Sequence, residues 1–183
     1  MPPECSPITR SLYAWEIQEA QRVFGISLTY ERVRVHECTA FPDTVDRLGR
    51  MLKRMPAPTQ PNAITLGMHS YFPIRLLEAL VPPSNIMHYQ IGWLIHELTH
   101  VRQFQKMGWT YLYQALKAQI MSGAQAYDFG GEAGLLEGTQ NGQKFKDFNL
   151  EQQGDICRSY YNRLARSLDV SAWKPYIDEI QDE

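Results

Sequence analysis

The stretch His96-Glu97-Leu98-Thr99-His100 has the residue types and spacing of a metal-dependent hydrolytic site. On an α-helix, His96 and His100 lie one turn apart on the same face, so their imidazoles can bind one metal ion from the same side. Glu97 lies close enough to act as general base for a water molecule on that ion. The motif therefore predicts two metal ligands, His96 and His100, and one catalytic residue, Glu97.

The residues around this motif fit an amphipathic helix. At about 100° per residue, one sector collects the apolar side chains Ile91, Leu94, Ile95, Leu98 and Val101. His96, His100, Gly92 and Gln103 fall roughly opposite, and we expect that side to face a cleft. The alternative is an ordinary amphipathic helix that carries two histidines. The lack of any charged residue except Glu97 between Ile91 and Val101 argues against it.

A catalytic zinc ion usually has three protein ligands and one water molecule, so a third ligand is needed. Glu151 and Asp155 are spaced i, i+4 in a second predicted helix. This spacing suits a ligand carboxylate beside a carboxylate that orients a ligand histidine. The alternative for this pair is a solvated helix face with local ion pairs. Glu132 and Glu137 compete with Glu151 for the ligand role, but they lie in a glycine-rich stretch that would hold a ligand less rigidly.

H-E-x-x-H followed by a helical E-x-x-x-D resembles the gluzincin branch of the zincin-like metallopeptidases. The resemblance implies a zincin-like fold, one catalytic Zn²⁺, Glu151 as third ligand and Asp155 as hydrogen-bond partner of a ligand histidine. It also implies hydrolysis of peptide bonds in a peptide or protein substrate. Leu150 stands before Glu151, where the best-studied members have Asn.

A narrower resemblance rests on residues 94–101 with Gln103 and Gln105, and on residues 149–155. These segments are similar to small bacterial zincins that occur beside Rhs elements, type VI secretion spike proteins and other injection systems. The similarity implies a toxin-like effector or accessory peptidase, exported by a specialised secretion system. It also implies an inhibitor or immunity protein as partner.

The expected mechanism uses zinc held by His96, His100 and Glu151 to lower the pKa of its bound water to about 7. Glu97 then takes the proton as the water attacks an amide carbonyl, and delivers it to the leaving nitrogen.

The donor that stabilises the oxyanion is not selected by any motif. His69 and His88 are candidates, although each is more simply an ordinary polar or half-buried histidine. Tyr160 and Tyr161 point away from Glu151 on the helical wheel, which argues against them.

Two other classes of function share these residues. One is zinc-dependent hydrolysis of a non-protein amide, such as one in peptidoglycan. The other is a non-enzymatic docking module built on a zincin fold. Glu97 argues against the docking module, because a structural zinc site needs no general base and normally fills its fourth position with a protein ligand.

Length and composition limit the remaining possibilities. The 183 residues suit one domain, residues 1–183. A hydrophobic fraction of 44%, a charged fraction of 21% and a net charge of −2 are typical of a globular protein. No basic block indicates binding to nucleic acid or to a membrane surface. The N-terminus lacks the pattern of a signal peptide, and no run has the length of a transmembrane helix, so we expect synthesis in the cytoplasm.

Three widely spaced cysteines, Cys5, Cys38 and Cys157, predict neither a disulfide framework nor a cysteine-based metal site.

Patterning predicts an α+β, mostly helical fold with a small sheet packed beside the H-E-x-x-H helix. We expect helices at 8–24, 43–55, 109–121, within 145–168 and at 173–181, strands at 27–37 and 62–70, an extended connector at 56–61 and a glycine-rich loop at 123–142. Ile64–His69 is the candidate edge strand that would pair with an extended substrate. A purely structural strand is the alternative for that segment.

Overall fold

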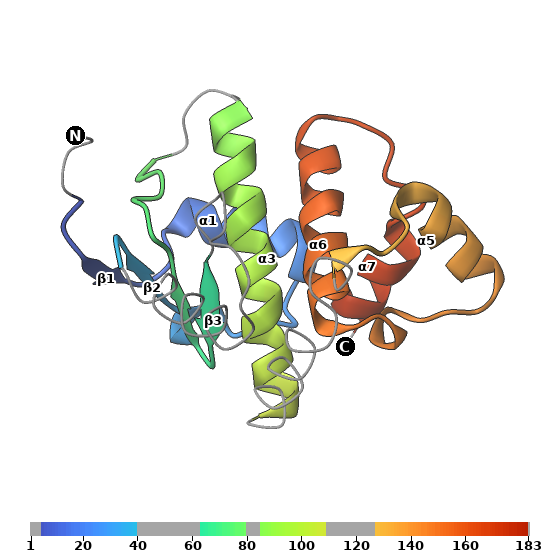
Figure 1. The fold of residues 1–183 in the computed structure, drawn as a ribbon, viewed down its shortest axis with the longest axis horizontal. Coiled ribbons are helices and arrows are strands. Elements are labelled where there is room, and N and C mark those ends of the chain that lie inside the picture. The colour runs from blue at the N-terminus through green and yellow to red at the C-terminus, as the bar shows by residue number, and fades with distance from the viewer. Residues whose placement is uncertain (1–4, 40–62, 80–84, 109–126, 183) are drawn as a thin grey trace, which may run out of the picture.

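A computed structural model describes residues 5–39, 63–79, 85–108 and 127–182. Within these ranges the chain forms an α+β fold, as predicted (Figure 1). The α-helices are α1 (Ala14–Phe24), α3 (Asn85–Met107), α5 (Gly131–Gln140), α6 (Leu150–Ala165) and α7 (Lys174–Gln181). The strands are β1 (Ile8–Arg10), β2 (Arg34–Glu37), β3 (Ile64–Leu66) and β4 (His69–Tyr71), and two 3₁₀ turns are η1 (Tyr30–Arg32) and η3 (Phe145–Asp147). The predicted helices at 43–55 and 109–121 and the connector at 56–61 lie outside the described residues.

The four strands form one mixed sheet in the order β1-β2-β4-β3. β2 and β4 pair in parallel, whereas the outer pairs β1/β2 and β4/β3 are antiparallel. One sheet face is buried and carries Val35, Ser70 and Thr65, which lie side by side on β2, β4 and β3. β3 packs against α3, so the sheet lies beside the H-E-x-x-H helix as predicted.

Helix α3 lies between the sheet on one side and α6 on the other (Figure 1). The predicted apolar stripe of α3 is buried: Ile91, Leu94, Ile95, Leu98 and Val101 are at most 2% exposed. The opposite side, with His96 and His100, faces α6 rather than an open cleft. Gly108 ends the helix with φ of 60°, a conformation that glycine adopts at low cost.

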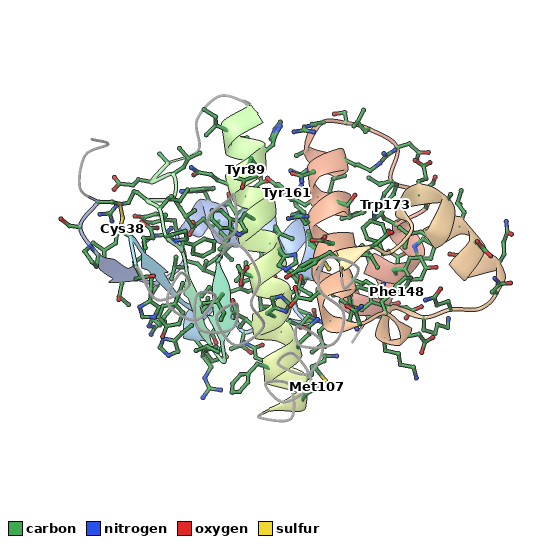
Figure 2. The ribbon with its side chains drawn as sticks, in the orientation of Figure 1. Cys38, Tyr89, Met107, Phe148, Tyr161 and Trp173 are labelled. Carbon is green, nitrogen blue, oxygen red and sulfur yellow. A yellow bond between two sulfur atoms is a disulfide. The ribbon has the colours of Figure 1, made fainter. Side chains whose placement is uncertain are left out.

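Helix α6 begins with a reciprocal cap. The Asn149 side chain accepts a hydrogen bond from the backbone N–H of Gln152, and the Gln152 side chain accepts one from the backbone N–H of Asn149. This cap fixes the first turn, which carries Glu151. Tyr161, labelled in Figure 2, lies further along the helix, is fully buried and donates a hydrogen bond to Glu19 of α1. It therefore points away from Glu151, as predicted.

The N-terminal segment differs from the prediction of a helix at 8–24. Residues 8–10 form β1, and α1 begins only at Ala14, where the Glu16 carboxylate accepts a hydrogen bond from the backbone N–H of Tyr13. Arg10 explains the difference, because it donates hydrogen bonds to Glu37 on β2 and to Glu16 on α1. Tertiary pairing therefore outweighs local helix propensity here.

The predicted strand at 27–37 is shorter than expected: η1 occupies Tyr30–Arg32 and only Arg34–Glu37 is extended. The predicted strand at 62–70 is a hairpin, with Gly67 and Met68 turning between β3 and β4. Of the two strands of this hairpin, β3 alone lies at an edge of the described sheet, so the candidate edge strand shrinks to Ile64–Leu66.

The predicted loop at 123–142 is wrong for residues 131–140, which form α5. Leu135 and Gly138 are the buried residues of this helix. The Tyr176 hydroxyl of α7 donates to the Leu135 carbonyl, which fixes α5 against α7. The expected C-terminal helices are present as α6 and α7.

The prediction of no disulfide was also wrong. Cys5 and Cys38 are bonded, with their Cα atoms 5.4 Å apart. The antiparallel pairing of β1 with β2 sets Ile8 opposite Glu37 and so brings the two cysteines to the same end of the strand pair. Cys157 is a buried free thiol.

No helix among the described residues is long and apolar enough to cross a membrane.

Candidate metal centre

Three side chains from α3 and α6 meet at one buried point. The Nε2 atoms of His96 and His100 are 3.1 Å apart, and Glu151 Oε2 lies 3.3 Å from the first and 3.5 Å from the second. All three residues are at most 6% exposed. Two imidazole nitrogens and one carboxylate oxygen thus form a nearly equilateral triangle that could hold a metal ion.

The size of this triangle fits zinc. Bonds of roughly 2.0–2.1 Å at tetrahedral angles place neighbouring ligand atoms about 3.3 Å apart. The observed separations of 3.1 to 3.5 Å bracket that value. Three protein donors also leave a fourth tetrahedral position for water, as in catalytic sites.

Asp155 fixes the orientation of His96. Its Oδ1 atom accepts a hydrogen bond from His96 Nδ1 at 2.8 Å. The same oxygen lies 2.9 Å from a guanidinium nitrogen of Arg158, one turn further along α6. Because the Nδ1 proton is bonded to Asp155, His96 presents Nε2 toward His100 and Glu151.

Gln103 fixes His100 in the same way, a role that the sequence pattern did not suggest. Its Oε1 atom accepts a hydrogen bond from His100 Nδ1 at 2.8 Å. The amide nitrogen of Gln103 donates to the Leu150 carbonyl and to Gln153 Oε1, which determines which end of the amide faces His100. Gln153 in turn donates to the Phe148 carbonyl, so the N-terminal turn of α6 supports this histidine.

Electrostatics inside the triangle follow from burial and close opposite charges. Burial alone would lower the pKa of His96, but its hydrogen bonds with Asp155 and Glu151 outweigh burial and raise the pKa to about 10. The pKa of His100 is raised too, because the attraction of Glu151 outweighs burial. Burial opposes ionisation of Glu151, yet the two histidines hold its pKa well below the usual range. A cation is therefore favoured at this point, whether it is a proton or a metal ion.

Glu97, the predicted general base, is 4% exposed on the same helix. Its Oε2 atom accepts a 2.8 Å hydrogen bond from the Thr65 hydroxyl of β3. The carboxylate is therefore held between α3 and the edge of the sheet.

Tyr127 lies against the metal-ligand triangle and was missed in the sequence. Its ring stacks on His96 with centroids 6.3 Å apart, and its hydroxyl lies near enough to Glu151 for the carboxylate to raise its pKa. Burial and the nearby carboxylates raise the pKa of Tyr127, so at neutral pH its hydroxyl keeps the proton and can donate it. No motif surrounds Tyr127, and only the fold brings it to this place.

The other candidates from the sequence lie elsewhere. Glu132 and Glu137 are exposed on α5, and Glu132 lies 3.5 Å from Arg163. His69 is on the solvent-facing side of β4, where it hydrogen-bonds to His36. His88 lies two turns before His96 and contacts Arg166. None of these four residues belongs to the ligand triangle.

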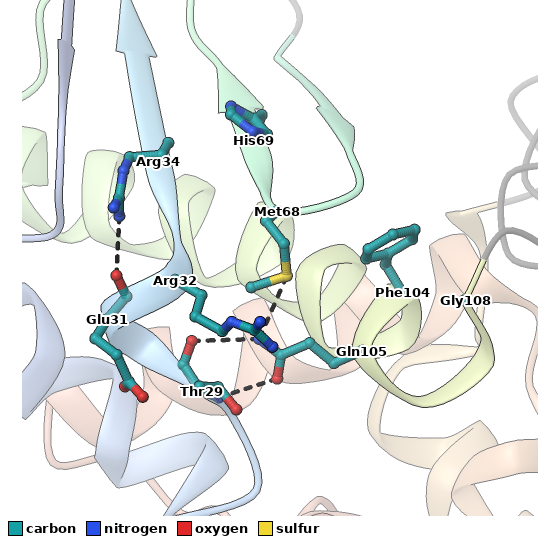
Figure 3. Close-up of a pocket in the computed structure, with 9 residues that line it drawn as sticks. All are labelled: Thr29, Glu31, Arg32, Arg34, Met68, His69, Phe104, Gln105 and Gly108. Carbon is teal, nitrogen blue, oxygen red and sulfur yellow. Dashed lines mark hydrogen bonds between the residues drawn. The ribbon is translucent and has the colours of Figure 1, made fainter.

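A hollow of about 760 Å³ lies between η1, β2, the β3–β4 turn and the last turn of α3 (Figure 3). Arg32, Arg34, His69 and Phe104 are among its lining side chains. Gln105 closes part of its floor through hydrogen bonds with the backbone of Thr29. None of the metal-ligand residues lines this hollow.

Comparison with known proteins shows similarity to a type VI secretion protein. Over 155 residues the chain is 30% identical to the type VI secretion system spike protein VgrG2b of Pseudomonas aeruginosa. The aligned region covers 83% of this chain but 13% of that protein, so the chain spans only a small part of its relative's length. No protein-family model matches the sequence, and no solved structure matches it.

Proposed function

We propose that this protein is a zinc-dependent metallopeptidase of the gluzincin type. The observation that carries the proposal is the buried triangle of His96, His100 and Glu151, with Glu97 on the same helix as the two histidines. Three ligand atoms at zinc-binding distances, a fourth tetrahedral position for water and a carboxylate base are the parts that metal-assisted hydrolysis requires.

His96, His100 and Glu151 would hold the ion, and Asp155 and Gln103 would keep the two imidazoles in the tautomer that binds it. A bound zinc ion supplies Lewis acidity, which polarises the scissile carbonyl and acidifies a water molecule. Glu97 accepts the proton of the attacking water and passes it to the leaving nitrogen. The Tyr127 hydroxyl donates a hydrogen bond to the oxygen on which negative charge develops, the role for which the sequence offered His69 and His88.

The similarity to VgrG2b supports a second part of the proposal. We infer that the chain acts in the setting of a type VI secretion system, as an effector or accessory peptidase. Such a protein would need an inhibitor or immunity protein in the cell that makes it. Co-purification of the chain with the products of its neighbouring genes tests this part without reference to catalysis.

Glu97→Gln tests the enzyme proposal. We expect the variant to keep one zinc ion per chain, because Glu97 is not among the ligand atoms, and to lose at least about 100-fold in turnover, because it lacks the base. Labelled casein and purified sacculi, assayed in parallel, separate peptidase activity from hydrolysis of peptidoglycan. An inactive wild type that contains zinc would contradict the proposal and favour a docking module. A Glu97→Gln variant as active as wild type would show that Glu97 is not the base.

A further inference from the structure

The general base is tied to the sheet by a chain of two hydroxyl groups. Thr65 Oγ1 lies 2.8 Å from Glu97 Oε2 and 2.9 Å from Ser70 Oγ. Thr65 is also 3.3 Å from the main-chain oxygen of Glu97, a longer contact. Thr65 and Glu97 are each 4% exposed and Ser70 is fully buried, so little water competes for these hydrogen bonds.

The number of available protons fixes which group donates in each of these hydrogen bonds. An ionised carboxylate only accepts hydrogen bonds, and each hydroxyl has one proton to donate. Thr65 therefore donates its proton to Glu97, and Ser70 donates its proton to Thr65. One carboxylate oxygen of Glu97 is thereby held, which restricts the rotation of the side chain about its three χ angles.

The fold, and not the local sequence, brings the three groups together. Thr65 is the middle residue of β3, and the antiparallel register places it directly opposite Ser70 of β4. The side chains of both point to the buried sheet face, against which α3 packs. β3 is at the edge of the described sheet, so the strand that fixes the base is also the candidate strand for pairing with an extended substrate.

We propose that Thr65, supported by Ser70, is the residue that positions Glu97 for catalysis. This inference rests on the proposed hydrolase function, since positioning has a purpose only if Glu97 acts as a base. The Thr65 side chain is not part of the ligand triangle, so we expect its loss to lower turnover and to leave metal binding intact.

The contact itself is tested without any activity measurement. Thr65→Val removes the hydroxyl and keeps the side-chain shape. We expect it to lower the urea midpoint more when Glu97 is present than in a Glu97→Ala background, where only the contacts of the hydroxyl with Ser70 and the main chain are lost. Equal effects of Thr65→Val in the two backgrounds would show that the hydroxyl and the carboxylate are not coupled, and would overturn the proposal.

The catalytic consequence is tested on whichever substrate the wild-type enzyme hydrolyses, casein or sacculi. For zinc-loaded Thr65→Val we expect kcat to fall by about 10- to 100-fold, the usual cost of losing a supporting partner. KM should change by less than about 2-fold, and zinc content should stay the same. Thr65→Ser, which restores the hydroxyl, should recover most of kcat, and Ser70→Ala should give an intermediate loss.

Thr139→Val is the matched control. This variant loses a hydroxyl that donates a hydrogen bond to the Leu135 carbonyl within α5. Thr139 is not part of the candidate site, so kcat should be unchanged. An active wild type with an equally active Thr65→Val variant overturns the positioning role alone. A zinc-loaded wild type that hydrolyses neither substrate overturns the hydrolase proposal, whatever the stability comparison shows.

Discussion

The imidazole of His96 occupies the space that a side chain on Gly154 would need. A Cβ atom built on Gly154 would lie 2.7 Å from Cε1 and 2.8 Å from Nδ1 of His96. Helices α3 and α6 can therefore approach closely enough to bring His96 and Glu151 together only if residue 154 has no side chain. The sequence Glu151-Gln152-Gln153-Gly154-Asp155 thus contains a packing requirement as well as two carboxylates.

For Gly154→Ala we expect His96 to move away from Nε2 of His100, and zinc affinity to fall by about 10- to 100-fold, as for loss of a partner that orients a ligand. Competition with a chromophoric zinc chelator measures the change. Gly92→Ala is the control, because the new methyl group would crowd the Asn162 side chain in the same helix pair, and Asn162 is not in the ligand triangle. Unchanged affinity in Gly154→Ala would mean that the helices can separate without cost to the site.

Glu151→Ala removes the proposed third metal ligand. We expect zinc affinity to fall by more than about 100-fold, since loss of a merely supporting partner already costs about 10- to 100-fold. Zinc per chain, measured after gel filtration, should drop from one to near zero. Glu132→Ala and Glu137→Ala should keep the metal, because both residues are exposed on α5. If Glu151→Ala retains one zinc ion per chain, the third ligand is a residue other than Glu151.

The raised pKa of His96 predicts the pH dependence of the metal-free protein. His96 titrates at about 10 in the folded state against 6.5 as an isolated group, so protonation favours the folded state. Its contribution to stability is fully present below pH 6.5 and is lost as the pH rises through about 10. Thermal unfolding in a chelator should therefore show a Tm that declines across this range.

Zinc changes that prediction, because the ion takes the place of the proton and binds better as the pH rises. The zinc-loaded protein should keep its Tm where the metal-free protein loses it. Asp155→Asn, which removes one cause of the raised pKa, should make the decline of the metal-free protein shallower. If the Tm of the metal-free wild type stays flat or rises over the same pH range, the raised pKa of His96 is contradicted.

Arg10 is predicted to be a major source of stability away from the site. Its guanidinium bonds Glu16 at 2.7 and 2.8 Å and Glu37 at 2.7 Å, and both carboxylates are 1% exposed. Arg10→Met leaves two buried carboxylates without this partner, which should cost about 3–5 kcal/mol of unfolding free energy. Urea denaturation measures it.

The exposed pair of Arg22 and Glu19 provides the comparison for Arg10. Arg22→Met should cost at most about 1 kcal/mol, as for other surface pairs. Similar losses in the two variants would show that burial does not strengthen the Arg10 network.

The ligand positions were predictable because they depend on short-range periodicity. His96 and His100 are one helical turn apart, as are Glu151 and Asp155, and each spacing is present in the sequence itself. The buried stripe of α3 follows from the same period, and Gly108 indicates where the helix ends. Local sequence thus predicted two helices, the side of each that bears the candidate metal ligands, and Glu97 as the candidate general base.

Only the tertiary structure decided what surrounds those groups. Thr65 contacts Glu97 from another element of the fold, and Tyr127 lies near Glu151 although it is far from it in the sequence, so no local pattern could select either residue. Gln103 lies on the same helix as His100, but its bonds to α6 become visible only in the fold. The same holds for β1 in place of a longer helix and for the bond between Cys5 and Cys38, both of which follow from strand pairing. Periodicity specifies which face of an element is polar, whereas long-range packing specifies what that face meets.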